Sequence, residues 1–183
     1  MHIFLTGEIQ VGKSTIIDKT LRICNVAYDG FRTYFGSDRG SPNRRLYMAS
    51  ASGEKVYLEE NVIVRFREEG LPQVLTERFD GYGVELIRLA RIKAQLIVMD
   101  ECGSLERNAF AFQEEILEAI AGSIPILGVI KQASNGWIDQ IRYHQNVKLI
   151  SVNEENRDAL PEYIASHLLR TFNSIYPIKL KAY

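Results

Sequence analysis

The segment GEIQVGKST, residues 7–15, constrains the fold of this chain more than any other stretch. It directly follows the apolar run HIFLT, and after it apolar residues recur at helical spacing from Ile16 to Cys24. An uninterrupted apolar run is typical of a strand buried on both faces, whereas steps of three and four predict an amphipathic helix. We therefore predict that the chain begins with a strand, a glycine-rich loop and a helix.

The loop matches the pattern G-x-x-x-x-G-K-[ST] through four of its residues, Gly7, Gly12, Lys13 and Ser14. Glycines let successive backbone N–H groups converge on phosphate oxygens, and the positive end of the helix adds to the attraction. Lys13 is expected to reach the β- and γ-phosphates and to stabilise the charge that develops on the transferred group, and the Ser14 hydroxyl to bind Mg²⁺. The predicted phosphate-binding residues are Gly7, Glu8, Ile9, Gln10, Val11, Gly12, Lys13, Ser14 and Thr15.

Three further apolar runs follow: QLIVMD (95–100), IPILGVI (124–130) and VKLISV (147–152). Helical patterns lie after them, over 112–120, 137–141 and 160–168. Strands that alternate with helices predict βαβ units and a parallel sheet. We expect one three-layer α/β domain over 1–183, mostly parallel, with helices on both faces of the sheet.

The stretch from about 28 to 80 has a different pattern. The short segments FRTYFG, RRLYMAS, KVYLEE and NVIVRFRE are partly alternating and are separated by Gly, Ser and Pro. They predict antiparallel hairpins that lie at the edge of the parallel sheet or cover it.

Two adjacent carboxylates end the run QLIVMD: Asp100 and Glu101. A strand that ends in Asp, in a fold with a phosphate loop, predicts a carboxylate that holds Mg²⁺ through a bound water. Glu101 is placed to orient a second water or to accept its proton, as a catalytic residue. Side chains alternate along a regular strand, so the two are expected to have different tasks. The alternative for Glu101 is a solvated residue at a strand end.

Composition excludes several other classes. The formal net charge is −1, which favours neither nucleic acid nor a membrane surface. Cys24 and Cys102 form no CxxC pair, so neither a disulfide framework nor a zinc site is indicated. The start of the chain lacks a basic region and a long apolar core, and no run reaches 18 apolar residues. We expect a soluble cytoplasmic protein.

Four segments together resemble one family. They are IFLTGEIQVGKSTIIDKTL, GFRT (30–33), LIVMDECGSLE (96–106) and VNEENRDAL (152–160). They are similar to the opening, the Gly-Phe-x-Thr element, the Asp-Glu-x-Gly-x-x-Glu signature and the Asn-Arg segment of the P-loop nucleoside-triphosphatases first described from thermophiles, which include the cancer-related nucleoside-triphosphatase of vertebrates. The resemblance implies slow, Mg²⁺-dependent hydrolysis of nucleoside triphosphates such as ATP and GTP, with little preference among bases.

Three positions depart from the family pattern. Gln10 stands where the family often has Gly, Phe35 where it usually has Glu, and Asn153 where it has Thr. A role for that family glutamate cannot be transferred to this chain. The departures place the chain in a divergent branch, whose preferred nucleotide can differ.

Less specific signals suggest two additional sites. Asn156 and Arg157 follow the run VKLISV, and an Arg plane there can stack on any base; the alternative is a solvated helix start. Glu106 either supports the metal site or begins the next helix, where a negative charge is favourable.

Two other functions compete with hydrolysis. Arg39, Arg44 and Arg45 lie in a Gly- and Pro-containing loop, 38–47, of the kind that phosphotransferases close over a substrate. This favours a small-molecule or nucleotide kinase as the alternative. A third reading is a nucleotide-dependent switch with vestigial hydrolysis and an unidentified protein partner. We favour transfer to water, directed by Glu101.

Overall fold

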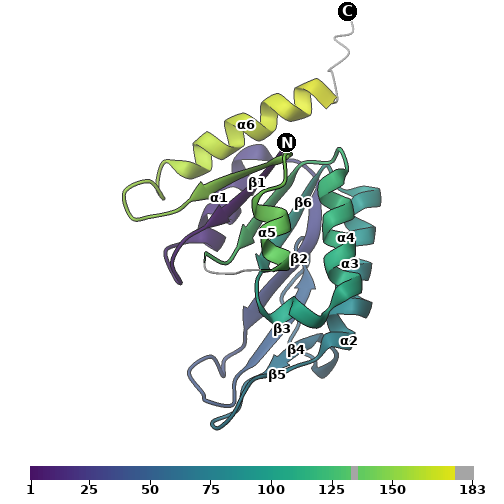
Figure 1. The fold of residues 1–183 in the computed structure, drawn as a ribbon. Helices are drawn as coiled ribbons and strands as arrows, with labels where there is room; N and C mark the ends of the chain where they lie inside the picture. The colour runs from purple at the N-terminus through teal and green to yellow at the C-terminus, as the bar shows by residue number, and fades with distance from the viewer. Residues whose placement is uncertain (133–135, 176–183) are drawn as a thin grey trace, which may run out of the picture.

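A computed structural model describes residues 1–132 and 136–175, with side chains described as far as Phe172 (Figure 1). Within this part the strands form one eight-stranded sheet in the order β5-β4-β3-β2-β6-β7-β1-β8. The strands are β1 His2–Thr6, β2 Tyr28–Phe35, β3 Arg45–Ser50, β4 Val62–Arg65, β5 Gln73–Val74, β6 Leu96–Cys102, β7 Ile126–Ile130 and β8 Val147–Ser151.

Helices cover both faces of this sheet (Figure 1). They are α1 Lys13–Cys24, α2 Thr76–Arg78, α3 Val84–Lys93, α4 Phe110–Ala121, α5 Trp137–Arg142 and α6 Leu160–Ile175. Buried residues of α1 and α6 pack into one apolar cluster, and those of α3, α4 and α5 into another. The predicted three-layer α/β architecture is confirmed.

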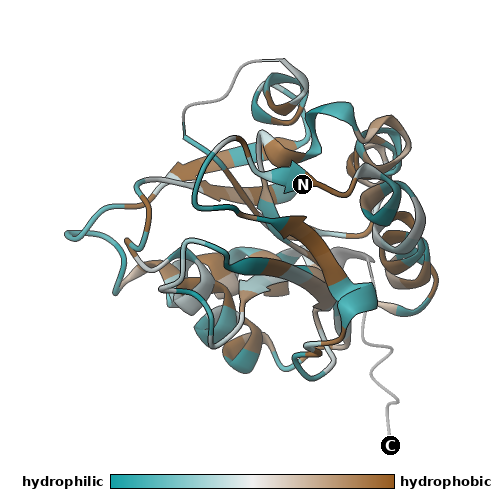
Figure 2. Ribbon diagram, turned by 90° about the horizontal axis from the view of Figure 1, so that it is seen from below, coloured by the Kyte–Doolittle hydropathy of each residue, from teal (hydrophilic) through white to brown (hydrophobic). Residues whose placement is uncertain are grey.

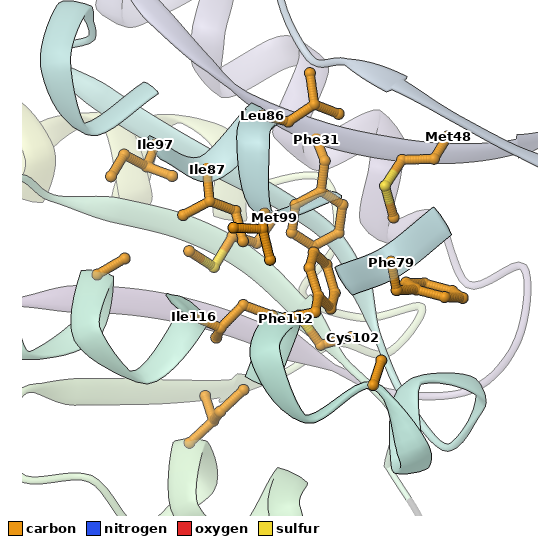
Figure 3. Close-up of a cluster of buried hydrophobic side chains, with 14 of the residues drawn as sticks. Phe31, Met48, Phe79, Leu86, Ile87, Ile97, Met99, Cys102, Phe112 and Ile116 are labelled. Atoms are coloured by element: carbon orange, nitrogen blue, oxygen red, sulfur yellow. The ribbon is translucent and has the colours of Figure 1, made fainter. Parts of the chain in front are cut away.

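Five neighbouring strands, β2, β6, β7, β1 and β8, pair in parallel, as expected of βαβ units. The larger core lies between this part of the sheet and α3 to α5 (Figure 3). Phe112 is at its centre, with ring centroids 5.2 Å from Phe31 and 5.4 Å from Phe79. In Figure 2 the helices carry both hydrophobic and hydrophilic residues, as is typical of amphipathic helices that cover a sheet with one face.

The antiparallel strands β3, β4 and β5 extend the edge of the same sheet, which confirms the predicted position of the 28–80 region. Two details of that prediction are wrong. The segment FRTYFG pairs in parallel with β6 as well as antiparallel with β3. KVYLEE forms no strand, because the Tyr34 hydroxyl both accepts the Val56 N–H (2.7 Å) and donates to the Val56 carbonyl oxygen (2.8 Å). Those backbone groups are therefore not available to a neighbouring strand.

Among the described helices none combines the length and the apolar character that crossing a bilayer requires.

Candidate active site

The loop between β1 and α1 is held in a conformation that depends on its glycines. Gly7 and Gly12 have φ of 143° and 110°, a region that L side chains rarely adopt. A Cβ at Gly7 would lie 2.5 Å from the carbonyl oxygen of Val152, the residue after β8, so there is no room for a side chain there. Gln10 has φ of 66°, at the position where the resembling family often carries Gly. Gln10 thus adopts a left-handed backbone conformation that is uncommon for a residue with a side chain.

Lys13 is buried at the centre of this loop. Its Nζ donates to the carbonyl oxygens of Gly7 (2.8 Å) and Glu8 (2.7 Å), and the residue is 8% exposed. The ammonium is thus held by the backbone of the loop it belongs to. A phosphate oxygen that entered the loop would find a cation already in position.

The sheet order brings the carboxylates to the loop. β6 lies two places from β1, and because the strands are parallel their carboxyl ends meet at one edge of the sheet. There they line a cavity of about 950 Å³. Of the predicted site residues, the cavity is lined by Ile9, Gln10, Gly12, Lys13, Ser14, Thr15, Asp100, Glu101 and Glu106.

Asp100 and Glu101 both line this cavity, although they are adjacent in β6. The pairing of β6 with β7 shifts register between Met99 and Cys102, so the regular alternation assumed from the sequence does not apply at this point. The two carboxylates therefore share one cavity, and their different tasks stay a prediction. Cys102, the next residue, is fully buried and packs in the larger core.

The Asp100 carboxyl is buried, and burial raises its pKa to about 6. The Ser14 side chain and the charge of Arg32 oppose this shift, while the negative charges of Glu101 and Asp18 add to it. A buried carboxylate among other carboxylates is stabilised by a cation.

Asp18 and Arg32 line the cavity and are among the site residues that were missed in the sequence. Arg32 lies opposite Asp100 in the β2–β6 pairing, and its Nη1 forms an ion pair with Asp18 at 2.6 Å. The spacing of Asp18 from Ser14, four residues along α1, places both on one helix face. That spacing was the available signal for Asp18. Lys55 and Lys131 also line the cavity, with no comparable signal in the sequence.

Glu106 supports the loop that follows β6. It lies in a short 3-10 helix, Leu105–Asn108, and accepts the Gly103 N–H at 2.8 Å. The Trp137 indole donates to the Gly103 carbonyl oxygen at 3.0 Å, so both backbone groups of this glycine are bonded. Burial raises the pKa of the Glu106 carboxyl to about 7.

We expect Glu106→Gln to stabilise the chain at alkaline pH. The pKa of Glu106 is about 7 in the folded chain against an ordinary 4.5, so the native state holds this proton more tightly than the unfolded state. The protonated Glu106 carboxyl therefore favours the folded state fully below pH 4.5, and this contribution to the free energy of unfolding is lost as the pH rises through 7. Since each step of one in pKa is worth about 1.4 kcal/mol, the variant should gain about 3 kcal/mol in free energy of unfolding at pH 8 and little at pH 4.5.

Urea unfolding of the nucleotide-free protein at several pH values measures this difference. Glu114→Gln, on the exposed face of α4, is the matched control. A Glu106→Gln variant whose stability ran parallel to that of the wild type at every pH would contradict the role of this carboxyl.

The predicted base-contact residues lie outside the cavity lining. The Asn156 side chain shapes the loop after β8, accepting the Asn153 N–H at 3.0 Å and donating to the Ser151 carbonyl oxygen at 2.9 Å. Arg157 is half-buried beside the phosphate loop, where its Cδ lies 4.0 Å from the position of a Cβ at Gly12. Stacking of Arg157 on a base therefore stays a prediction. The residue lies beside Gly12, where the loop meets α1.

The donor set around Ser14 is suited to Mg²⁺. The Ser14 hydroxyl and the Asp100 carboxylate are hard oxygen ligands on one cavity wall. The described residues contain no cluster of three or more His, Cys, Asp or Glu side chains arranged to hold a metal. Mg²⁺ usually takes one or two protein ligands and completes its shell with waters and phosphates, so this small set is sufficient.

A parallel sheet, a glycine-rich loop with a buried lysine between β1 and α1, and carboxylates at the end of β6 together define the P-loop class of nucleotide-binding proteins.

A family model described as NTPase matches residues 2–165. The chain is 29% identical to the nucleoside-triphosphatase THEP1 of Natranaerobius thermophilus over 91% of its length and 96% of that protein. It is 27% identical to the THEP1 of Thermotoga maritima, covering 92% of the chain and 95% of that protein. The chain therefore belongs to the NTPase family.

Two solved structures share the fold. The crystal structure of THEP1 from Aquifex aeolicus matches 92% of the chain and 99% of its own length, with a TM-score of 0.74 at 23% identity. The solution structure of a human cancer-related nucleoside triphosphatase matches 92% and 97%, with a TM-score of 0.72 at 25% identity.

Proposed function

We propose that this protein hydrolyses nucleoside triphosphates to diphosphate and phosphate, that the reaction requires Mg²⁺, and that it is slow with low selectivity among bases. The observation that carries the proposal is the position of Glu101, a half-buried carboxylate in the same cavity as Lys13, Ser14 and Asp100. The printed names of the relatives, nucleoside-triphosphatase THEP1, support the same reaction.

The loop binds the triphosphate through its backbone N–H groups. On binding, Lys13 exchanges the carbonyl oxygens of Gly7 and Glu8 for oxygens of the β- and γ-phosphates. Ser14 and Asp100 are the residues that would hold Mg²⁺, the latter through a water. The ion, when bound, neutralises negative charge on the phosphate oxygens.

Glu101 then directs the water. Its carboxylate orients a water molecule behind the γ-phosphorus and accepts the proton as the new P–O bond forms. The bond from the γ-phosphorus to the bridging oxygen breaks, and the diphosphate leaves with that oxygen. Arg32, opposite Asp100 and bonded to Asp18, keeps a positive charge close to the carboxylates. The ion pair with Asp18 therefore keeps the Arg32 guanidinium near the γ-phosphate while the reaction proceeds.

Low base selectivity follows from where the polar groups lie. Lys13, Asp100 and Glu101, the charged residues proposed to act on the triphosphate, lie at the phosphate loop and the end of β6. On the other side of the loop the nearest predicted base contact is Arg157, whose planar side chain can stack on any base without reading its hydrogen-bonding pattern.

Phosphate release from ATP, GTP, CTP and UTP, with Mg²⁺ and with EDTA, tests the proposal. We expect release from several nucleotides with Mg²⁺ and its loss with EDTA, because Ser14 and Asp100 can then hold no ion beside the triphosphate. Nucleotide binding is measured on the same samples. Tight binding without phosphate release would refute hydrolysis and favour a nucleotide-dependent switch with a protein partner.

A further inference from the structure

The cavity continues past the carboxylates into a second region. We call this region the outer lobe, and define it by Phe35, Arg39, Arg44, Leu46 and Phe66, all of which line the cavity. Leu46 is buried, Phe35, Arg44 and Phe66 are half-buried, and Arg39 is exposed. The hydrolysis proposed above uses none of these five residues.

The outer lobe lies on the far side of the carboxylates from the phosphate loop. In the sheet, β2 and β1 are on opposite sides of β6. Arg32 pairs with Asp100, and Phe35 is three residues farther along β2, which is about 10 Å at the rise of a strand. A triphosphate whose last phosphate reaches Asp100 and Glu101 therefore ends before the outer lobe, which is left for a second molecule.

The side chains of the outer lobe combine a flat cation with aromatic rings. The Arg44 guanidinium lies over the Phe66 ring at 4.4 Å and over the Phe35 ring at 5.6 Å, and the two ring centroids are 5.7 Å apart. The Phe66 N–H donates to the Arg44 carbonyl oxygen at 2.9 Å, which fixes the two residues side by side. One guanidinium N–H donates to the Ser41 carbonyl oxygen at 3.5 Å, and the other N–H groups of the fork can bind an anion.

Among the residues that the structure describes, neither Arg39 nor Arg44 forms an ion pair. The adjacent Arg45 differs, because it is paired with Asp38 at 3.2 Å and lines a separate cavity with Tyr47 and Tyr57. Of the three arginines predicted to form a lid, only Arg39 and Arg44 reach the nucleotide cavity.

We propose that the outer lobe is a second ligand site, and that it binds a small molecule carrying a phosphate monoester and a planar ring, the chemistry of a nucleoside monophosphate. Arg39 and Arg44 bind the phosphate monoester, and Phe35, Leu46 and Phe66 bind the ring. The inference rests on the proposed position of the triphosphate in the 7–15 loop, which places this second ligand beside the terminal phosphate.

Calorimetric titration tests the site with the full-length chain. The phosphate loop is first saturated with Mg²⁺ and the non-hydrolysable ATP analogue AMPPNP, so that a second nucleotide cannot bind there. AMP, GMP, CMP and UMP are then titrated, with inorganic phosphate and adenosine as the separate halves of the ligand. We expect at least one monophosphate to bind with one-to-one stoichiometry, and more tightly than either half.

Variants separate the outer lobe from the rest of the cavity. Arg44→Leu and Phe66→Leu should each weaken monophosphate binding about tenfold or more, since each removes a direct contact, and should leave AMPPNP binding unchanged. Arg45→Leu, on the neighbouring residue, should change neither. Two substitutions are used because one of them could impair folding, which thermal unfolding reveals.

Either of two results would overturn the proposal. In the first, none of the monophosphates binds saturably to the wild-type protein loaded with AMPPNP; in the second, a monophosphate binds equally well to the wild type, Arg44→Leu and Phe66→Leu. Phosphate release without any added monophosphate is measured in the same preparations. Release without monophosphate binding refutes the outer lobe alone, whereas monophosphate binding without release refutes hydrolysis alone.

Discussion

Replacing Glu101 with Gln is expected to lower the rate of phosphate release about 10²-fold, the typical contribution of a positioned general base. The amide keeps the size of the side chain and can still bond a water, but it cannot accept the proton. Nucleotide binding should be unchanged, because in the proposed mechanism Glu101 contacts the attacking water and not the phosphate chain. Steady-state phosphate release and equilibrium binding on the same protein give both quantities.

Glu114→Gln, on the exposed face of α4, is the control for this substitution. A Glu101→Gln protein that released phosphate within threefold of the wild-type rate would remove Glu101 from the mechanism. Release would then require another group in the cavity to orient the water.

Lys13→Met is expected to weaken both the binding of the triphosphate and its hydrolysis. The Lys13 ammonium is the only basic side chain that is predicted to contact the β- and γ-phosphates directly. Loss of one such charged donor typically lowers the rate 10²–10³-fold, which corresponds to about 3–4 kcal/mol. Unlike Glu101→Gln, this variant should also bind the triphosphate at least tenfold more weakly. The two variants together separate binding from the activation of water.

Lys19→Met, on the exposed face of the same helix, is the matched control. Lys13 also donates to two carbonyl oxygens of the loop, so its loss should lower the free energy of unfolding by about 2 kcal/mol, at about 1 kcal/mol for each hydrogen bond. Unchanged triphosphate affinity in a folded Lys13→Met protein would contradict the proposed binding of phosphate in this loop.

The parallel core of the fold could be predicted from the sequence because its signals are local. The runs around Phe4, Val98 and Val129 are continuous and apolar, as strands buried on both faces require, and the helices after them have clear periodicity. The helix α3, Val84–Lys93, was not predicted. It follows the segment FDGYG, a π-helical turn whose two glycines are typical of a loop.

The candidate site could be predicted only where a motif carries it. The loop and Asp100 have fixed spacings in their motifs, so they were found, and the structure places them in one cavity. Arg32 and Lys131 enter the cavity because the ends of β2 and β7 lie beside the end of β6, which is a property of the strand order. A single sequence contains no local signal for that order.

The bonds of Lys13 to Gly7 and Glu8 have a consequence for selectivity. Any anion that enters the loop must replace two good acceptors, so its affinity is the difference between two bonded states and not the strength of one. An ion that offers the ammonium a single weak acceptor gives it less hydrogen-bonding energy than the two carbonyl oxygens of the empty loop. The loop should therefore discriminate strongly against chloride and other simple monovalent anions, and this selectivity is set before any nucleotide base is encountered.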